Sequence, residues 1–446
     1  MAVPTGSRKG KLHVQIFVRS AAVLVWLTIL ACGSTLTLAN PLTLEQALSI
    51  GLQSNPDVLA YQLRIVEAKE SLGEAKGAFL PTLSLSYNRN LISDSSGSGG
   101  NTDYIDQESD QVVARLSQPI FSGFGGVAGL DKAYQGEHYA RLELGLIKSQ
   151  IASKIRGAFY DILLTQELVE RRQSSVERLE SQRRIAQAWV GQSMAPRIRL
   201  LEVEVELSNA RQQHVTALAN LAIARARLGE LLAIEATSKV EVEGQLTNDL
   251  DKACDGLDAC LALALEQRKE LQLIDVGVDM ARQDQKMVLA RNLPRASLDL
   301  SWTDYQREYE NELLNGDDRD YYSLGMSVSI QPFQGARNIF AWRRLSAVVK
   351  RLQQNRVKQG NTIVTEVKSA LEQLQEGHAR IAAATDGLTE AKEAYHLVSR
   401  SAELGVSSLR ELLDTEQLLT EAEINMINAR HALQLSRVQL DYVLGH

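Results

Sequence analysis

The chain has 446 residues, of which 44% are hydrophobic, and a formal net charge of −7. Its length alone suggests two or three domains. The acidic balance argues against nucleic acid as a partner, because phosphate backbones are bound by a surplus of lysine and arginine. After residue 40 no apolar run is long enough for a membrane helix, so any segment that spans a membrane has to be a strand.

Residues 1–39 have the pattern of an export signal, in which basic residues precede an apolar run and small residues follow it. We expect cleavage after Ala39, so that the mature chain begins at Asn40 without a lipid. The alternative is a lipoprotein-type site that would leave a lipidated Cys32, although Leu30 fits that pattern poorly. With either site, the chain leaves the cytoplasm.

Two cysteines, Cys254 and Cys260, remain after the signal is removed. In an oxidising compartment they can form a disulfide that closes a short loop. The other reading, two small thiols in the segment between two halves of the chain, stays open. A zinc site is not expected, because no histidine lies near them in the sequence.

An internal repeat covers most of the chain. Leu80-Pro81 recurs as Leu293-Pro294, and Gln118-Pro119 recurs as Gln331-Pro332, so both pairs are displaced by the same distance along the sequence. A shift that stays constant over about 75 residues indicates a duplication. We therefore expect a signal peptide at 1–39, a first repeat at 40–235, an inter-repeat segment at 236–256 and a second repeat at 257–446.

Each repeat is predicted to contain a helix, two strands joined by a polar loop, a very long helix and a return helix. In the first repeat these elements are Leu44–Ala78, Thr82–Arg89, Gln111–Gln118, Gly126–Trp189 and Arg197–Ala233. In the second they are Leu257–Asn292, Ser297–Tyr305, Tyr321–Gln331, Ala336–Glu403 and Leu409–Leu444. Thr43 is the expected N-cap of the first helix, with Gln46 as its capping-box partner. Prolines are expected to end the strands at both Gln-Pro pairs.

The last of these strands alternates strictly between apolar and polar residues. Successive side chains of a strand point to opposite faces, so the strand has one apolar face and one polar face. Its length suits a tilted strand of a membrane barrel, and the alternative is a strand of a soluble sandwich. In a membrane, Leu324, Met326 and Val328 are expected to face lipid, and Ser327 and Ser329 the lumen.

The two long helices contain no proline. About 65 helical residues extend roughly 100 Å. The second long helix carries a seven-residue repeat of apolar and small residues, which is typical of supercoiled helix packing. A plain coiled-coil rod would show the same pattern.

Four strands cannot close a membrane barrel, and an open strand edge cannot face lipid. If the strands span a membrane, several chains have to contribute their strands to one closed barrel. Two chains would supply eight strands, three would supply twelve and four would supply sixteen. A soluble protein has no such need. Oligomerisation therefore separates the two interpretations.

In its duplication, its Leu-Pro and Gln-Pro pairs and its glycine-containing turns, the chain resembles the TolC-like outer-membrane efflux family from Leu42 to about Leu444. The resemblance implies an α-dominated fold with membrane β structure. Three copies would form a 12-stranded outer-membrane barrel, continued by a long α-helical barrel through the periplasm. It also implies a passive exit duct of a tripartite efflux or type I secretion system, which docks onto a periplasmic adaptor protein and an inner-membrane transporter. The alternative function is a structural or adhesive coiled-coil protein of the cell envelope.

The resemblance also implies two sets of functional residues. The adaptor-docking tips of the helical hairpins would be Val190, Gly191, Leu404, Gly405 and Val406, with a longer tip in the first repeat. The pore gate would be Glu411 and Asp414, which share a face of the return helix; in a trimer they would form rings of carboxylates. A solvated acidic face is the alternative. No nucleophile–base pair, phosphate loop or metal cluster stands out in the sequence, so we expect no enzyme activity, cofactor or bound metal.

Overall fold

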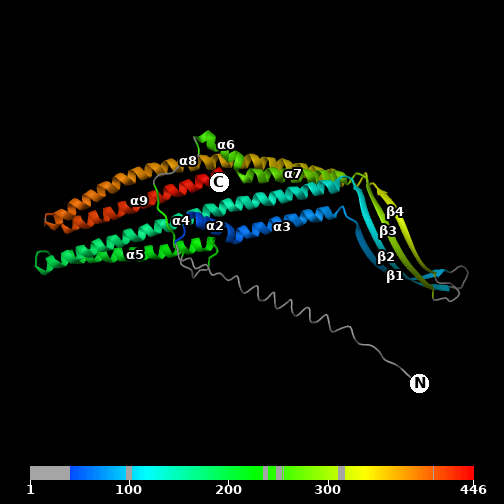
Figure 1. The fold of residues 1–446 in the computed structure, drawn as a ribbon, viewed down its shortest axis with the longest axis horizontal. Helices are drawn as coiled ribbons and strands as arrows, with labels where there is room; N and C mark the ends of the chain where they lie inside the picture. The colour runs from blue at the N-terminus through cyan, green and yellow to red at the C-terminus, as the bar shows by residue number, and fades with distance from the viewer. Residues whose placement is uncertain are drawn as a thin grey trace, which may run out of the picture.

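The structure is a computed structural model that describes residues 41–96, 103–234, 240–247, 254, 256–309, 317–404 and 406–445. The predicted signal peptide with Ala39 and Cys32, most of the inter-repeat segment and Gly405 lie outside the described residues. The molecule is strongly elongated: the strands lie together at one end, and two helical hairpins reach the opposite end (Figure 1). Among the described helices, none is both long and apolar enough to cross a membrane.

The two repeats contain the same elements in the same order, which confirms the duplication. The first repeat consists of α2 (Leu44–Ser54), α3 (Pro56–Gly77), β1 (Thr82–Ser96), β2 (Asp103–Ser122), α4 (Gly125–Gly191) and α5 (Arg197–Leu231). The second consists of α6 (Leu257–Gln267), α7 (Lys269–Ala290), β3 (Arg295–Tyr309), β4 (Asp317–Ser329), α8 (Arg337–Glu403) and α9 (Leu409–Leu444). At 67 residues each, α4 and α8 are as long as their sequences predict.

The first helix of each repeat is broken into two, where a single helix was expected. In the first repeat the break falls at Asn55, whose side chain accepts a hydrogen bond from the Asp57 N–H and donates one to the Leu231 carbonyl. Pro56 follows at the first position of α3, where its missing N–H costs nothing. In the second repeat the extended backbone of Arg268 makes the break without a proline. The capping box between Thr43 and Gln46 is confirmed.

The four strands form one antiparallel sheet in the order β1-β2-β3-β4. The register places apolar residues opposite one another across the sheet, as in Leu116, Leu300 and Leu324 on neighbouring strands. The adjacent row is polar: Ser301 Oγ and Ser323 Oγ lie 2.8 Å apart on β3 and β4. The sheet therefore has one apolar and one polar face, as the alternation predicts.

All four strands extend farther toward their connecting loops than expected: β1 continues to Ser96, β2 begins at Asp103, β3 continues to Tyr309 and β4 begins at Asp317. The strand ends near the two Gln-Pro pairs differ from expectation as well. Strand β2 continues past Pro119 to Ser122, through a register shift between Pro119 and Phe121. Pro119 still lies opposite Ser297, and Ile120, the next residue, has no partner on β3. The pairing is therefore interrupted by a bulge beside the proline, and the strand does not end there. Strand β4 ends at Ser329, two residues before the predicted Gln331.

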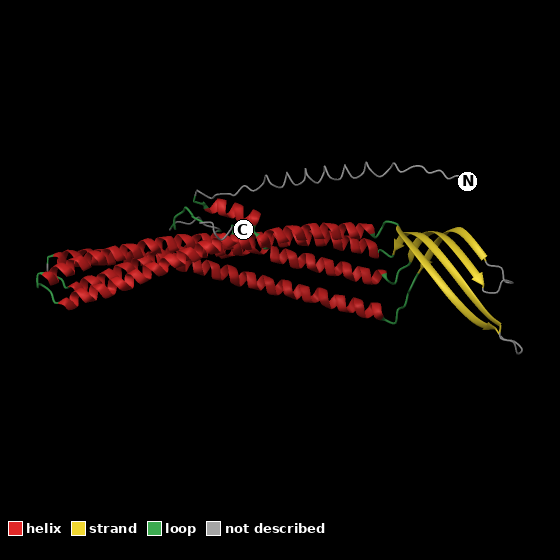
Figure 2. Ribbon diagram, turned by 90° about the horizontal axis from the view of Figure 1, so that it is seen from below, coloured by secondary structure: helices red, strands yellow, loops and turns green. Residues whose placement is uncertain are grey.

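The helices form a single layer that continues the sheet. Near the strands the neighbouring helices are α3, α4, α7 and α8 in that order, and near the tips they are α5, α4, α9 and α8 (Figures 1 and 2). One edge of the layer thus consists of β1, α3 and α5, and the other of β4 and α8. Both edges run the length of the molecule.

The middle of the molecule holds the largest apolar core. Ile155 and Ile162 of α4 are fully buried there against Leu228 of α5 and the short helix α2. A second core joins α6 to α8 and α9 and contains the fully buried Cys260. Cys260 forms a disulfide with Cys254, which settles the open question about these two residues and attaches the inter-repeat segment to this core.

Candidate functional site at the helical tips

Both hairpins reverse direction through an equivalent backbone hydrogen bond, in which an N–H donates to the carbonyl of the residue five positions earlier. The Met194 N–H donates to the Trp189 carbonyl at 2.8 Å, and the Val406 N–H donates to the Ser401 carbonyl at 2.9 Å. The connecting loops, 192–196 and 404–408, are equally long, so the longer first tip that the sequence suggested is wrong. In the first hairpin the left-handed backbone lies at Ser193, with φ of 56°, and Gly191 is the last residue of α4.

The tips present apolar side chains to solvent. Leu404 is 77% exposed, Val406 is 80% exposed and Met194 is 74% exposed. Val190 is half-buried and Gly191 is exposed. The sequence interpretation did not single out Met194, although an apolar residue in a loop between two helix ends is a sign of such exposure. Apolar groups held this far from the core are suited to contact with another protein.

The two predicted gate residues lie exposed on the same face of α9, one turn apart. The carboxylate of Glu411 accepts a hydrogen bond from the Ser408 N–H at 2.9 Å, and the Glu411 N–H donates to Ser408 Oγ at 3.2 Å. Glu411 therefore completes the capping box of α9, a local role that the sequence interpretation missed. Asp414 lines a hollow of about 370 Å³ between α5 and α9, together with Glu206 and Arg410.

A buried polar cluster joins the two hairpins on the other side of α9. The carboxylate of Glu416, only 4% exposed, accepts hydrogen bonds from Ser175 Oγ at 2.8 Å, from Thr420 Oγ1 at 2.9 Å and from Arg178 Nε at 3.2 Å. Arg178 also lies 3.5 Å from Glu423. A buried charge is tolerated only when it is paired and hydrogen-bonded, and Glu416 meets both conditions.

A signal for this cluster was present in the sequence. Leu409, Leu412, Glu416 and Leu419 follow one another at intervals of three, four and three residues, which is the spacing of a buried helix face. A glutamate in such a row needs a partner from another helix. Nearby on α4, burial lowers the pKa of the Arg172 guanidinium, and the charges of Glu416 and Glu421 oppose that shift. In the described part of the chain, no group of three or more metal-binding side chains is placed to hold an ion.

The family comparison matches each repeat separately. The profile of the outer membrane efflux proteins matches residues 47–233 and again 260–446. The start and the end of the second match lie the same number of residues after the start and the end of the first. Leu293-Pro294 follows Leu80-Pro81 by this same number of residues.

The chain belongs to the outer membrane efflux protein family.

Relatives and solved structures agree with this assignment. The chain is 19% identical to the outer membrane protein TolC of Vibrio cholerae over 88% of both chains, and 24% identical to the outer membrane efflux protein BepC of Brucella suis over 92% of this chain and 87% of the relative. Its fold matches the CmeC outer membrane channel of Campylobacter jejuni with a TM-score of 0.77, at 14% identity, over 90% of this chain and 85% of CmeC.

Membership of the family decides between the functions that the sequence left open. The protein is an outer-membrane efflux channel that extends into the periplasm, and it is not an enzyme. The helices are the periplasmic part and the four-stranded sheet is the chain's share of a membrane barrel. A purely structural or adhesive coiled-coil protein is thereby set aside.

Proposed function

We propose that three copies of the chain form a continuous exit duct of a tripartite efflux or type I secretion system. An inner-membrane transporter supplies the energy, a periplasmic adaptor protein docks onto the helical tips, and the duct itself is passive. The observation that carries this proposal is the pair of open edges along the whole molecule, β1 with α3 and α5 on one side and β4 with α8 on the other.

The two edges cannot remain open in an outer membrane. A strand edge leaves backbone N–H and C=O groups unpaired, and in lipid each such group costs several kcal/mol. The helical edges also expose large apolar side chains: Leu59, Leu63 and Val66 on α3, and Ile339, Phe340 and Trp342 on α8. Pairing the β4 edge of one copy with the β1 edge of the next gives the backbone groups their partners and brings the apolar side chains of α8 and α3 together. With three copies the ring closes with twelve strands.

The tips support the docking part of the proposal. The loops that join α4 to α5 and α8 to α9 lie at the end of the molecule farthest from the strands (Figure 1). Met194, Leu404 and Val406 are the most exposed apolar residues of these loops. With Val190 and Gly191 they form an apolar end surface for an adaptor. Gly405, which the sequence also assigns to the docking tip, lies outside the described residues. The cluster between Arg178 and Glu416 holds the two hairpins side by side, so that both tips can be presented to one partner.

The duct is tested by measuring its assembly and conductance. The purified mature protein is expected to run as a trimer by mass photometry in detergent and to open ion-conducting pores in planar lipid bilayers. Trimeric closure follows from the two edges, and conductance follows from a lumen lined by the polar face of the sheet. A monomer that gives no conductance would refute the proposal.

We further propose that Glu411 and Asp414 form the gate at the periplasmic end of the duct. They share an exposed face of α9 close to the tip, and threefold symmetry would repeat each of them as a ring. Carboxylates held close together attract cations and repel one another, so bound cations would block the pore.

The gate test has to preserve the cap of α9. Glutamine can replace Glu411 in a capping box, so the variant of choice is Glu411→Gln with Asp414→Asn. We expect this double variant to fold normally, to lose cation selectivity and to resist block by divalent and trivalent cations in single-channel recordings. Glu372→Gln, an exposed position far from the tip on α8, is the control and should behave like the native protein. Unchanged selectivity and block in the double variant would show that the two carboxylates are only a solvated face.

A further inference from the structure

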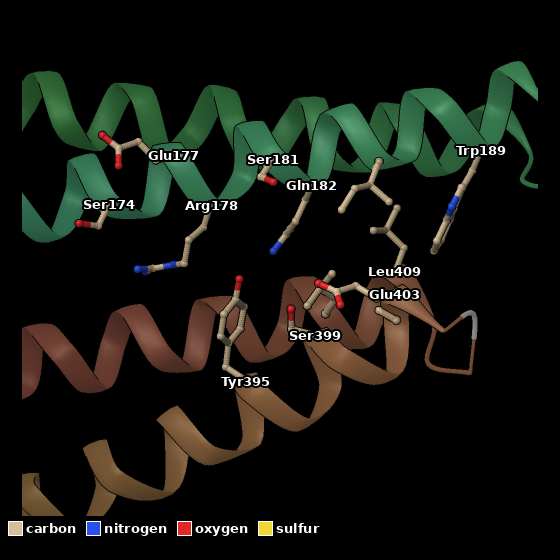
Figure 3. A pocket seen from close by; sticks show the side chains of 13 residues that line it. Ser174, Glu177, Arg178, Ser181, Gln182, Trp189, Tyr395, Ser399, Glu403 and Leu409 are labelled. Carbon is tan, nitrogen blue, oxygen red and sulfur yellow. The ribbon is translucent and has the colours of Figure 1, made fainter.

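A cavity of about 430 Å³ lies between the two hairpins, close to the tips. One wall is α4, with Arg178, Gln182 and Trp189, and the other wall is the end of α8 and the start of α9 (Figure 3). The volume is within the range of small-molecule sites and far exceeds that of a single water.

Gln182 is the unusual feature of this cavity. Its side chain is only 3% exposed, yet neither its Nε2 nor its Oε1 has a hydrogen-bond partner among the described residues. A buried amide left without partners destabilises a protein, and most buried polar groups are paired. In Figure 3 the Gln182 amide points from α4 into the cavity, towards Tyr395 and Ser399 of α8. A partner for Gln182 is therefore expected from outside the chain.

The charges of the cavity favour a cation. Its lining contains two carboxylates, Glu177 and Glu403, and one basic group, Arg178. Arg178 is already shared between Glu416 and Glu423, at 3.1 Å and 3.5 Å, so its positive charge is not free for a ligand. An anion in the cavity would meet two carboxylates without a free basic group to balance them.

The remaining lining defines the shape and polarity of the ligand. Oxygen atoms of Tyr395, Ser399 and Glu403 face the same space as the Gln182 amide (Figure 3). Hydroxyl, carboxylate and amide oxygens can all accept hydrogen bonds from an ammonium group. Next to them the lining is apolar or aromatic, with Ile185, Trp189, Ala402, Leu409 and Leu412. An aromatic face can also attract a cation directly.

We propose that this cavity binds a small protonated amine that carries an apolar or aromatic body. The ammonium group donates hydrogen bonds to the oxygens of Gln182, Tyr395 and Ser399 and is balanced by Glu403. The apolar body lies against Trp189 and the leucines of α9. The site uses both hairpins of one chain, so it goes beyond the exit duct and does not depend on the trimer.

Binding also has a mechanical consequence. The ligand contacts α4 on one side and α8 with α9 on the other, so it favours the relative position of the hairpins in which the cavity has its present size. A ligand shifts an equilibrium only by its difference in affinity for the two states. An amine of this class therefore stabilises the hairpin arrangement described here against any arrangement that separates α4 from α8.

The test compares two probes that differ mainly in charge. Phenethylamine, protonated at pH 7, and 2-phenylethanol have the same aromatic body, and binding of each to the full-length protein in detergent is measured by isothermal titration calorimetry. We expect saturable binding of one phenethylamine per chain and no comparable binding of 2-phenylethanol. Absence of saturable amine binding, as in a cavity that holds only water, would overturn the proposal. Equal binding of both probes would also overturn it.

Two variants connect the binding to the cavity. Gln182→Leu is expected to weaken phenethylamine binding by at least about tenfold, because hydrogen bonds to a charged group are lost. The same variant should raise the thermal unfolding temperature, since it removes a buried amide without partners. Glu403→Gln, at an exposed position, is expected to weaken binding by about fivefold, the effect of one partly exposed charge pair.

The control is Glu390→Gln, which removes a carboxylate from an exposed position of α8 that does not line the cavity. It should leave phenethylamine binding unchanged. Native-like binding in both cavity variants, or equal weakening in the control, would place the amine elsewhere and overturn the proposal. Because binding is measured without a bilayer, its failure is distinguishable from a failure of the duct to conduct.

Discussion

An arginine in place of Leu324 is expected to destabilise the assembled barrel by about 2–4 kcal/mol, the cost of a basic side chain facing lipid near the bilayer midplane. Leu324 lies near the middle of β4, is 70% exposed in the single chain and continues the apolar row of Leu116 and Leu300. The measurement is the urea dependence of folding into lipid vesicles, followed by the resistance of the folded barrel to unfolding in detergent.

The matched control is an arginine at Ser323, the preceding residue at almost the same depth. Ser323 belongs to the polar row, where its hydroxyl lies 2.8 Å from that of Ser301. Facing a water-filled lumen, the new charge should be tolerated much better than at Leu324. Equal destabilisation at the two positions would show that the apolar face does not contact lipid.

Replacing Arg268 with methionine is expected to lower the free energy of unfolding by about 2–3 kcal/mol, because the change removes one partner of a buried ion-pair network. Arg268 is 4% exposed and lies between Glu270 at 3.0 Å and Glu366 at 2.9 Å. It also donates to the Val443 carbonyl and lies over the ring of Tyr442. Its loss should loosen the junction of α6 and α7 from α8 and α9. Thermal unfolding of the trimer measures the effect.

Arg356→Met is the matched control. Arg356 also bridges α7 and α8, through Asp275 at 2.6 Å, but both side chains are about half exposed. An exposed pair contributes about 0–1 kcal/mol, since water and salt screen it. If the two arginine variants unfold at the same temperature, the buried network around Arg268 contributes no more to stability than a surface pair. The predicted stabilising role of Arg268 would then be wrong.

Much of this architecture could be predicted from the sequence. The alternation of the strands determined the two faces of the sheet, because strand side chains point to opposite sides with a period of two. The absence of proline from the long helices determined their length, and the bounds of α5, α8 and α9 agree with expectation to within about two residues. The constant offset between the Leu-Pro and Gln-Pro pairs determined the order of the elements in both repeats. All of these are local or periodic signals, which are present in the sequence before any packing.

Tertiary structure decided the features that depend on contacts between distant residues. Ser175 and Glu416 are 241 positions apart, and only the packing of α4 against α9 brings them within hydrogen-bond distance. The same packing leaves the Gln182 amide without a partner and creates the cavity beside it. Arg268 breaks a helix without proline, because its buried ion pairs compensate for the lost helical turn. The physical reason is common to all three: a residue's own sequence neighbours determine its local conformation, whereas its burial and its partners depend on which helices lie beside it.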